Sequence, residues 1–323
     1  MKLLYSSALV LFLILGPAGG QAHAAAAAAD PTPAAGKLPN LLDARRGFTT
    51  RLIRKERDGT PIPVPPAHIF SLIRYDAPGG KNGAYLSPNP GDGKKHPAII
   101  WLTGGDSNTI GEVWHAAPAA NDQSAAAYRK AGIVMMFPSL RGGNDNPGHR
   151  EAFLGEVDDI LAAADHLARQ DYVDPKRIYL GGHSTGGTLV LLAAASSSRF
   201  RAVFSFGPVA DVAGYGPDML PFDPTGTREL SLRAPGRWLQ AITVPVFVIE
   251  GEGGNIDDLK SMAAASRNPK IQFLAVQGAG HFTVLAPVNR LIAEKIMADT
   301  GPAGQLAISQ AEVNRPFQWA PRK

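Results

Sequence analysis

The chain has 323 residues, which is enough for one large or two ordinary domains with a substantial core. Its formal net charge is only +4, and its basic residues do not gather into a patch that would suit a nucleic acid, so we expect no nucleic-acid partner. The absence of cysteine excludes a disulfide framework and a lipidated cysteine.

Residues 1–24 have the anatomy of a secretory signal peptide. Lys2 precedes an apolar run at residues 8–15, and Ala22-His23-Ala24 offers a small-x-small cleavage site. The run is short for a spanning helix, and an uncleaved anchor is the competing interpretation. Removal of this segment takes the formal charge from +4 to +3, because Lys2 is its only charge. We therefore predict a bacterial periplasmic or secreted protein with no membrane attachment after cleavage.

Residues 25–66 predict a flexible leader followed by an N-terminal arm. Their first part is rich in alanine, proline and glycine, and residues 59–66 contain four prolines, a composition typical of extended chain without core material. We expect the folded domain to occupy residues 67–300. Residues 301–323 have little pattern and predict a C-terminal tail.

Within residues 67–300, short apolar runs alternate with helical patterns. Residues 70–75 and 84–86 predict a hairpin. Strands buried on both faces are predicted at residues 98–102, 133–137, 178–180, 202–206, 244–249 and 271–276. Helices are predicted at residues 123–130, 153–168, 191–195, 256–265 and 284–298. This alternation predicts a mostly parallel sheet covered on both faces, and residues 212–240, which lack periodicity, predict a short cap.

The segment Gly182-His183-Ser184-Thr185-Gly186 lies between a predicted strand and a predicted helix. In that context Gly-x-Ser-x-Gly is a nucleophile elbow, whose glycines leave room around a strained serine. Ser184 would then lie at a helix N-terminus, where the dipole favours developing negative charge. We predict that Ser184 is a nucleophile. The competing interpretation is a glycine-rich loop with a solvated serine.

Two further features point to acyl-transfer chemistry. His281 follows the last predicted strand, and the carboxyl ends of parallel strands meet at one edge of a sheet, so His281 can act on Ser184 as general base and then general acid. An oxyanion hole would use the backbone N–H of Thr185 and that of Gly105, which lies in a glycine turn after an earlier strand.

Other polar residues give weaker signals. Arg141 either binds a substrate carboxylate or pairs with Glu151 or Glu156. The histidines show no metal-ligand spacing, and neither a phosphate loop nor a dinucleotide fingerprint is present, so we expect no metal and no cofactor.

The assembled motifs resemble the α/β-hydrolase superfamily, and within it the dienelactone hydrolase and prolyl oligopeptidase-like branch. The matching text is the elbow, residues 173–178 before it, the acidic stretch at residues 155–159, and Arg141-Gly142-Gly143. The resemblance covers residues 70–298. It implies an α/β-hydrolase fold, with a mostly parallel central sheet, helices on both faces and a short cap. It also implies hydrolysis through an acyl-enzyme without a cofactor.

The acid of the expected triad departs from the family pattern. In that pattern an aspartate follows three residues after a strand-end glycine, a position that Gly254 occupies here. We favour Glu252, which lies two residues earlier in the same loop. Asp257 and Asp211 are the alternatives, as is a site without this acid, whereas Glu250 would be a strand-end charge that meets solvent.

These observations predict a serine hydrolase that acts on a small-molecule ester or a short peptide. An ester substrate is favoured, because no sequence feature indicates recognition of a peptide backbone or terminus. The first alternative is an exported peptidase of the prolyl oligopeptidase-like type, without the propeller, for which residues 1–69 are too few. The second is a non-catalytic binding protein on a hydrolase fold. The oligomeric state is left open.

Overall fold

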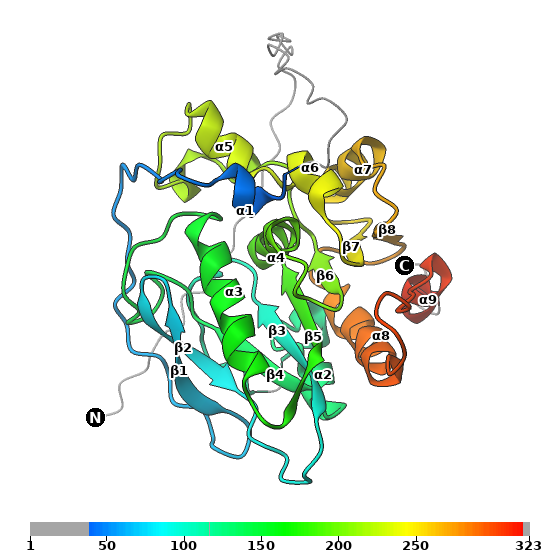
Figure 1. Ribbon diagram of the computed structural model, residues 1–323. Coiled ribbons are helices and arrows are strands. Elements are labelled where there is room, and N and C mark those ends of the chain that lie inside the picture. Colours follow the sequence, from blue (N-terminus) through cyan, green and yellow to red (C-terminus); the bar gives the residue numbers. More distant parts are fainter. Residues whose placement is uncertain (1–38, 116, 319–323) are drawn as a thin grey trace, which may run out of the picture. The chain divides into compact units, whose positions relative to one another are not determined.

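In the computed structural model, which describes residues 39–115 and 117–318, eight strands form one sheet (Figure 1). The strands are β1 (Ser71–Ala77), β2 (Gly80–Leu86), β3 (His96–Leu102), β4 (Val134–Pro138), β5 (Val173–His183), β6 (Val203–Phe206), β7 (Val246–Gly251) and β8 (Ile271–Val276). Their order is β1-β2-β4-β3-β5-β6-β7-β8, and only the β1–β2 and β2–β4 pairs are antiparallel. The predicted signal peptide and residues 25–38 lie outside the described residues.

The two faces of the sheet carry separate cores, which explains why the strands are apolar throughout. Along β3, Ala98 and Ile100 belong to one core, whereas Ile99 and Trp101 belong to the other. Successive side chains of a strand point to opposite faces, so a strand covered on both sides needs apolar residues at every position. The predicted class, a mostly parallel sheet with helices on both faces, is confirmed.

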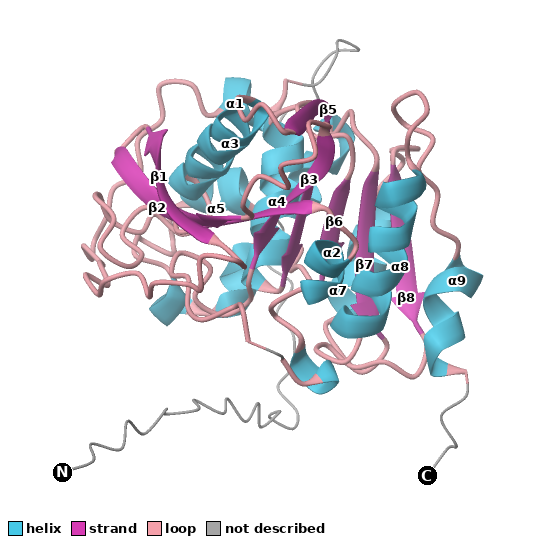
Figure 2. Ribbon diagram, turned by 90° about the horizontal axis from the view of Figure 1, so that it is seen from below, coloured by secondary structure: helices cyan, strands magenta, loops and turns pink. Residues whose placement is uncertain are grey.

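The helices divide between the two faces of this sheet. They are α1 (Leu41–Ala44), α2 (Ala126–Lys130), α3 (Gly155–Ala168), α4 (Thr185–Ser196), α5 (Thr227–Arg233), α6 (Pro235–Trp238), α7 (Ile256–Ala265), α8 (Leu285–Ala298) and α9 (Gln310–Asn314). Helices α3, α4 and α7 supply the first core, and α2 and α8 the second. Figure 2 shows α8 against β7 and β8. Every described helix is too short or too polar to cross a bilayer.

Helix α4 follows the elbow and is buried along its whole length. Its sequence is apolar on every side, which suits a helix enclosed between the sheet and other helices. Helices α1, α3 and α6 pack against it from the side away from the sheet (Figure 1). The start of α4, which directly follows Ser184, is therefore held by packing.

The cap and the arm are joined to each other. Residues 212–241 form short helices, including α5 and α6, separated by prolines. Arg233 of α5 is fully buried, stacks at 4.1 Å over the ring of Phe222, and donates to Thr50 Oγ1 at 2.6 Å. Leu52 forms an antiparallel bridge with Phe222. This part of the predicted arm thus packs against the cap.

The C-terminal segment also has more structure than its weak pattern suggested. Helix α9 begins with a capping box, in which the Ser309 and Glu312 side chains each bond to the other's backbone N–H. Gln310 Nε2 donates to the carbonyl of Ala275 on β8 at 2.6 Å. Because β8 pairs on one side only with β7, α9 covers part of the sheet edge.

Candidate active site

The predicted elbow is present at the junction of β5 and α4. Ser184 has φ 55° and ψ −115°, a strained conformation for a residue with a side chain, and its N–H donates to Phe206 O at 2.7 Å. A Cβ on Gly186 would lie 2.5 Å from Leu102 O, and one on Gly182 would lie 2.6 Å from Gly186 O. Only glycine fits at these two positions, so the backbone around Ser184 is held in the strained form.

His281 lies beside a buried carboxylate. Its Nδ1 is 2.8 Å from Glu250 Oε2, and the Glu250 side chain is fully buried at the end of β7. Two backbone groups also donate to this carboxylate, Gly251 N–H at 2.7 Å and Asn255 N–H at 3.0 Å. With Nδ1–H directed at the carboxylate, Nε2 of His281 carries the lone pair that a general base needs.

The acid that contacts His281 is therefore Glu250, which corrects the sequence-based preference for Glu252. Glu252 is exposed beyond the end of β7, and Asp257 is exposed in the first turn of α7. Asp211 accepts from Ala213 N–H at 3.0 Å and caps a short helix. In the part of the chain that the structure describes, no hydrogen bond joins any of these three carboxylates to His281.

Two glycines make room for the Glu250–His281 pair. A Cβ on Gly254, the position of the family's aspartate, would lie 2.5 Å from Glu250 Oε1. A Cβ on Gly207 would lie 2.6 Å from Glu250 Oε2 and 2.5 Å from His281 Cε1. The Glu250 carboxylate thus fills space that a side chain at residue 254 would need, which accounts for the glycine there.

The candidate oxyanion donors lie next to the serine. A Cβ on Gly104 would lie 3.1 Å from Ser184 Cβ, so the glycine turn contacts the elbow directly. The Gly104 N–H is already bonded to Gln123 Oε1 at 3.1 Å, whereas no partner for Gly105 N–H or Thr185 N–H occurs among the described residues. Thr185 Oγ1 donates to Gly105 O at 2.9 Å and fixes the turn. Of the two predicted donors, Thr185 directly follows Ser184, and Gly105 directly follows the Gly104 that contacts the elbow.

The serine and the histidine are not hydrogen-bonded to each other in the described residues. Bonds of this kind commonly tighten only in the complex with substrate. No group of three or more His, Cys, Asp or Glu side chains in the described ranges is placed to hold a metal ion.

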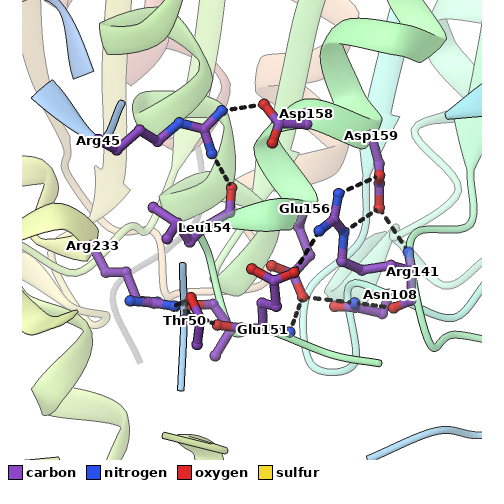
Figure 3. Close-up of polar contacts among 11 residues, drawn as sticks. Arg45, Thr50, Asn108, Arg141, Glu151, Leu154, Glu156, Asp158, Asp159 and Arg233 are labelled. Carbon is purple, nitrogen blue, oxygen red and sulfur yellow. Dashed lines mark hydrogen bonds and ion pairs between the residues drawn. The ribbon is translucent and has the colours of Figure 1, made fainter. Parts of the chain in front are cut away.

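Arg141 is a structural residue in this arrangement. Its guanidinium donates to both Asp159 oxygens, at 3.0 and 2.9 Å, and to Glu151 Oε1 at 2.5 Å (Figure 3). Of the alternatives left open by the sequence, the structure shows the pairing with Glu151. Glu156 instead accepts from Asn108 Nδ2, and burial raises the pKa of its carboxyl.

A cleft of about 470 Å³ lies between the arm and α3, close to this cluster. Its lining includes Arg45, which pairs with Asp158 and donates to Leu154 O (Figure 3). Neither Ser184 nor His281 lines it. Two of its arginines are paired with carboxylates of the lining, Arg45 with Asp158 and Arg141 with Glu151, so these charges do not identify a ligand.

Two polar residues that sequence reasoning missed complete the site. His183, buried beside Ser184, has Nδ1 at 2.8 Å from Gln123 Nε2 and Nε2 at 3.0 Å from His281 O. Burial, helped by nearby His281, lowers the pKa of His183 to about 3, so its ring is neutral near pH 7. A histidine inside an otherwise small and apolar elbow was the available signal. Gln123 gave none.

Comparisons with known proteins show what the sequence and the fold resemble. The model of the Prolyl oligopeptidase family matches residues 119–231. A dual function macrocyclase-peptidase of Galerina marginata is 34% identical over 89 residues, which are 25% of this chain and 12% of that protein. The chain therefore spans only a small part of this curated relative.

Solved structures show the same fold. A puromycin-hydrolyzing peptidase of Mycobacterium tuberculosis has TM-score 0.57 and 23% identity, over 71% of this chain and 39% of that one. A Pyrobaculum calidifontis esterase has TM-score 0.52 and 18% identity, over 74% and 87% respectively. The chain thus shares its fold with a solved peptidase and a solved esterase, and its serine lies in a strand–elbow–helix turn. Its family match lies in the prolyl oligopeptidase branch.

Proposed function

We propose that this protein hydrolyses ester or amide bonds through an acyl-enzyme on Ser184, with His281 as base and Glu250 as the acid of the triad. The observation that carries the proposal is the fully buried Glu250 carboxylate, 2.8 Å from His281 Nδ1, at the same edge of the sheet as the elbow. A buried carboxylate is costly without partners, and here its partners fix one tautomer of the histidine.

The proposed reaction follows from these positions. His281 Nε2 takes the proton from Ser184 Oγ, and the oxygen attacks a carbonyl whose developing charge the N–H groups of Gly105 and Thr185 stabilise. The leaving alcohol or amine takes the proton from His281. Water then repeats the cycle and releases the acid. Glu250 stabilises the imidazolium.

We favour a small ester as the substrate class, because no group in the described site is arranged to bind a peptide terminus. Peptidase activity on short substrates is the second candidate, and the match to the Prolyl oligopeptidase family supports it. The leader sequence supports export to the periplasm or the medium, which would expose the site to small molecules from outside the cell.

A fluorophosphonate probe tests the nucleophile directly. We expect rapid labelling of the purified protein, and loss of labelling in both Ser184→Ala and His281→Ala. Ser205→Ala is the matched control, because Ser205 is a buried serine that donates to Gly187 O at 2.8 Å and is not part of the proposed triad. p-Nitrophenyl esters and aminoacyl anilides would then separate esterase from peptidase. A folded wild-type protein that does not label would favour a binding protein.

A further inference from the structure

Three loops of the active site are joined by side chains that do not take part in the proposed reaction. The oxyanion turn contributes Gly104, the elbow contributes His183, and the loop after β8 contributes His281. Gln123, from the segment between residues 121 and 126, reaches the first two. We propose that Gln123 and His183 are positioning residues, which hold the oxyanion turn and the catalytic histidine in register through a one-way chain of hydrogen bonds. This inference rests on the proposed function.

The donor-to-acceptor direction of this hydrogen-bond chain is fixed at both ends. The Gly104 backbone N–H can only donate, so the Gln123 side-chain oxygen must face it, at 3.1 Å. The Gln123 amide nitrogen is then directed at His183 Nδ1, at 2.8 Å, and Nδ1 must accept. At the other end, the His281 carbonyl can only accept, so His183 Nε2 must carry the hydrogen, at 3.0 Å. Both requirements are met by one neutral tautomer of His183, with the hydrogen on Nε2 and none on Nδ1.

Other contacts keep this chain in place. Gln123 Nε2 also donates to Asn121 Oδ1 at 2.9 Å, which holds the amide plane. The His183 ring is buried and lies 4.4 Å, between centroids, from the ring of His281 and 5.3 Å from that of Phe282. Burial lowers the pKa of His183, so the neutral ring required by the chain persists at working pH.

The chain links both parts of the site whose relative position matters for catalysis. The oxyanion donor at Gly105 follows Gly104 directly, and the general base is His281 itself. Small displacements between a base and the groups that stabilise a transition state cost rate rather than substrate binding. We therefore expect loss of the chain to lower kcat and to leave KM nearly unchanged.

Substitution of His183 tests this expectation. His183→Leu keeps the site apolar but removes both bonds, and we expect kcat to fall by about ten- to a hundredfold. His183→Gln offers one acceptor and one donor on the same amide, and we expect it to retain kcat near the wild-type value. Equal losses in the two variants, with both folded by circular dichroism, would overturn the proposal.

Gln123→Glu tests the direction of the chain. A carboxylate can accept from Gly104 N–H but cannot donate to His183 Nδ1, so the chain is broken at its second bond. Gln170→Glu is the matched control, because Gln170 lies 3.2 Å from His166 in a similar glutamine–histidine pair away from the elbow. We expect kcat to fall in the first variant and to be unchanged in the second.

Nitrogen NMR of the full-length protein gives a readout independent of activity. The protein contains eight histidines, and the signals of His183 are identified as those lost in His183→Gln. We expect an unprotonated Nδ1 and a protonated Nε2 from pH 5 to 8, and a protonated Nδ1 in Gln123→Glu. The opposite tautomer, or titration within this range, would overturn the inference. If the expected tautomer is found in a protein that does not label with fluorophosphonate, the proposed function fails while the hydrogen-bond chain stands.

Discussion

The Glu250 carboxylate is buried near the C-terminal end of β7, at the sheet edge that carries the candidate active site. A buried charge is stable only when it is paired and hydrogen-bonded, and Glu250 has one histidine and two backbone N–H partners. Its position follows from the pairing of β7 with β8, in which Glu250 lies opposite Ala275 and Gly251 opposite Val276. The His281 loop begins just beyond that last pair.

Removal of the charge at this residue should disable the base. We expect Glu250→Gln to lower kcat by roughly 10⁴-fold, as loss of a triad acid typically does, because Nδ1 of His281 loses the acceptor that selects its tautomer. Glu252→Gln, two residues away and exposed, is the control and should leave ester hydrolysis unchanged. Steady-state kinetics decide between them. A larger loss in the Glu252 variant would restore the sequence-based assignment.

The glycine at residue 254 allows a complementary gain-of-function test. In the native protein, a Cβ at residue 254 would lie 2.5 Å from the Glu250 carboxylate. Glu250→Ala removes this carboxylate and leaves room for a side chain there. We expect the addition of Gly254→Asp to recover part of the lost kcat. Gly253→Asp, one residue earlier in the same loop, serves as the control. Failure of both additions to raise kcat would mean that the acid acts only from the strand.

At the scale of single elements, sequence patterns identified those parts whose structure depends on neighbouring residues. The helix at residues 256–265 and the strand at residues 271–276 have the predicted bounds, because their periodicity is continuous. The elbow was identified for the same reason. The contacts of Glu250 and Gln123 were not, since they join residues 31 and 60 positions apart through the packing of loops. The chain sequence carries no local sign of such pairs.

Helix α9 was missed although its start carries a capping box at Ser309 and Glu312. Five residues are too few for a periodic pattern, and the cap is the only local signal. The hydrogen bond from the Lys295 side chain is the main cause that lowers the pKa of Glu312 to about 2. This carboxylate is therefore ionised throughout the working range. The helix is therefore held by its cap, by Lys295 and by its contact with β8.

Loss of the cap should loosen this element. We expect Ser309→Ala to lower the free energy of unfolding by about 0.5–2 kcal/mol, because Glu312 N–H loses its acceptor. Ser261→Ala, at an exposed position within α7, should have little effect. Urea unfolding measures both values, and hydrogen exchange of residues 310–314 reports on α9 itself. An unchanged exchange rate in Ser309→Ala would show that the cap does not hold the helix.

For the whole molecule, the buried histidine next to the nucleophile makes stability depend on pH. The pKa of His183 is about 3 in the folded protein and 6.5 in the unfolded chain. Above pH 6.5 neither state binds the proton. As the pH falls from 6.5 toward 3, the unfolded chain binds a proton that the folded protein does not, and stability is lost at up to about 1.4 kcal/mol per pH unit.

This dependence can be measured by comparison with a variant. We expect the free energy of unfolding of the wild-type protein to fall more steeply between pH 6 and pH 4 than that of His183→Gln, which has no titrating group at this position. His166→Gln is the control, because His166 is only partly buried and its pKa is lowered less. Parallel curves for wild type and His183→Gln would show that the folded protein accepts the proton.

The placement of an acid on a strand has a consequence for how related genomes are interpreted. Surveys that require an aspartate at the position of Gly254 would count this chain, and others with Glu-Gly at the end of the same strand, among degenerate hydrolases. A glutamate one residue before the strand-end glycine, together with glycine in place of the aspartate, is a two-position signature. It would separate chains that carry a carboxylate on the strand from chains that lack one at both positions.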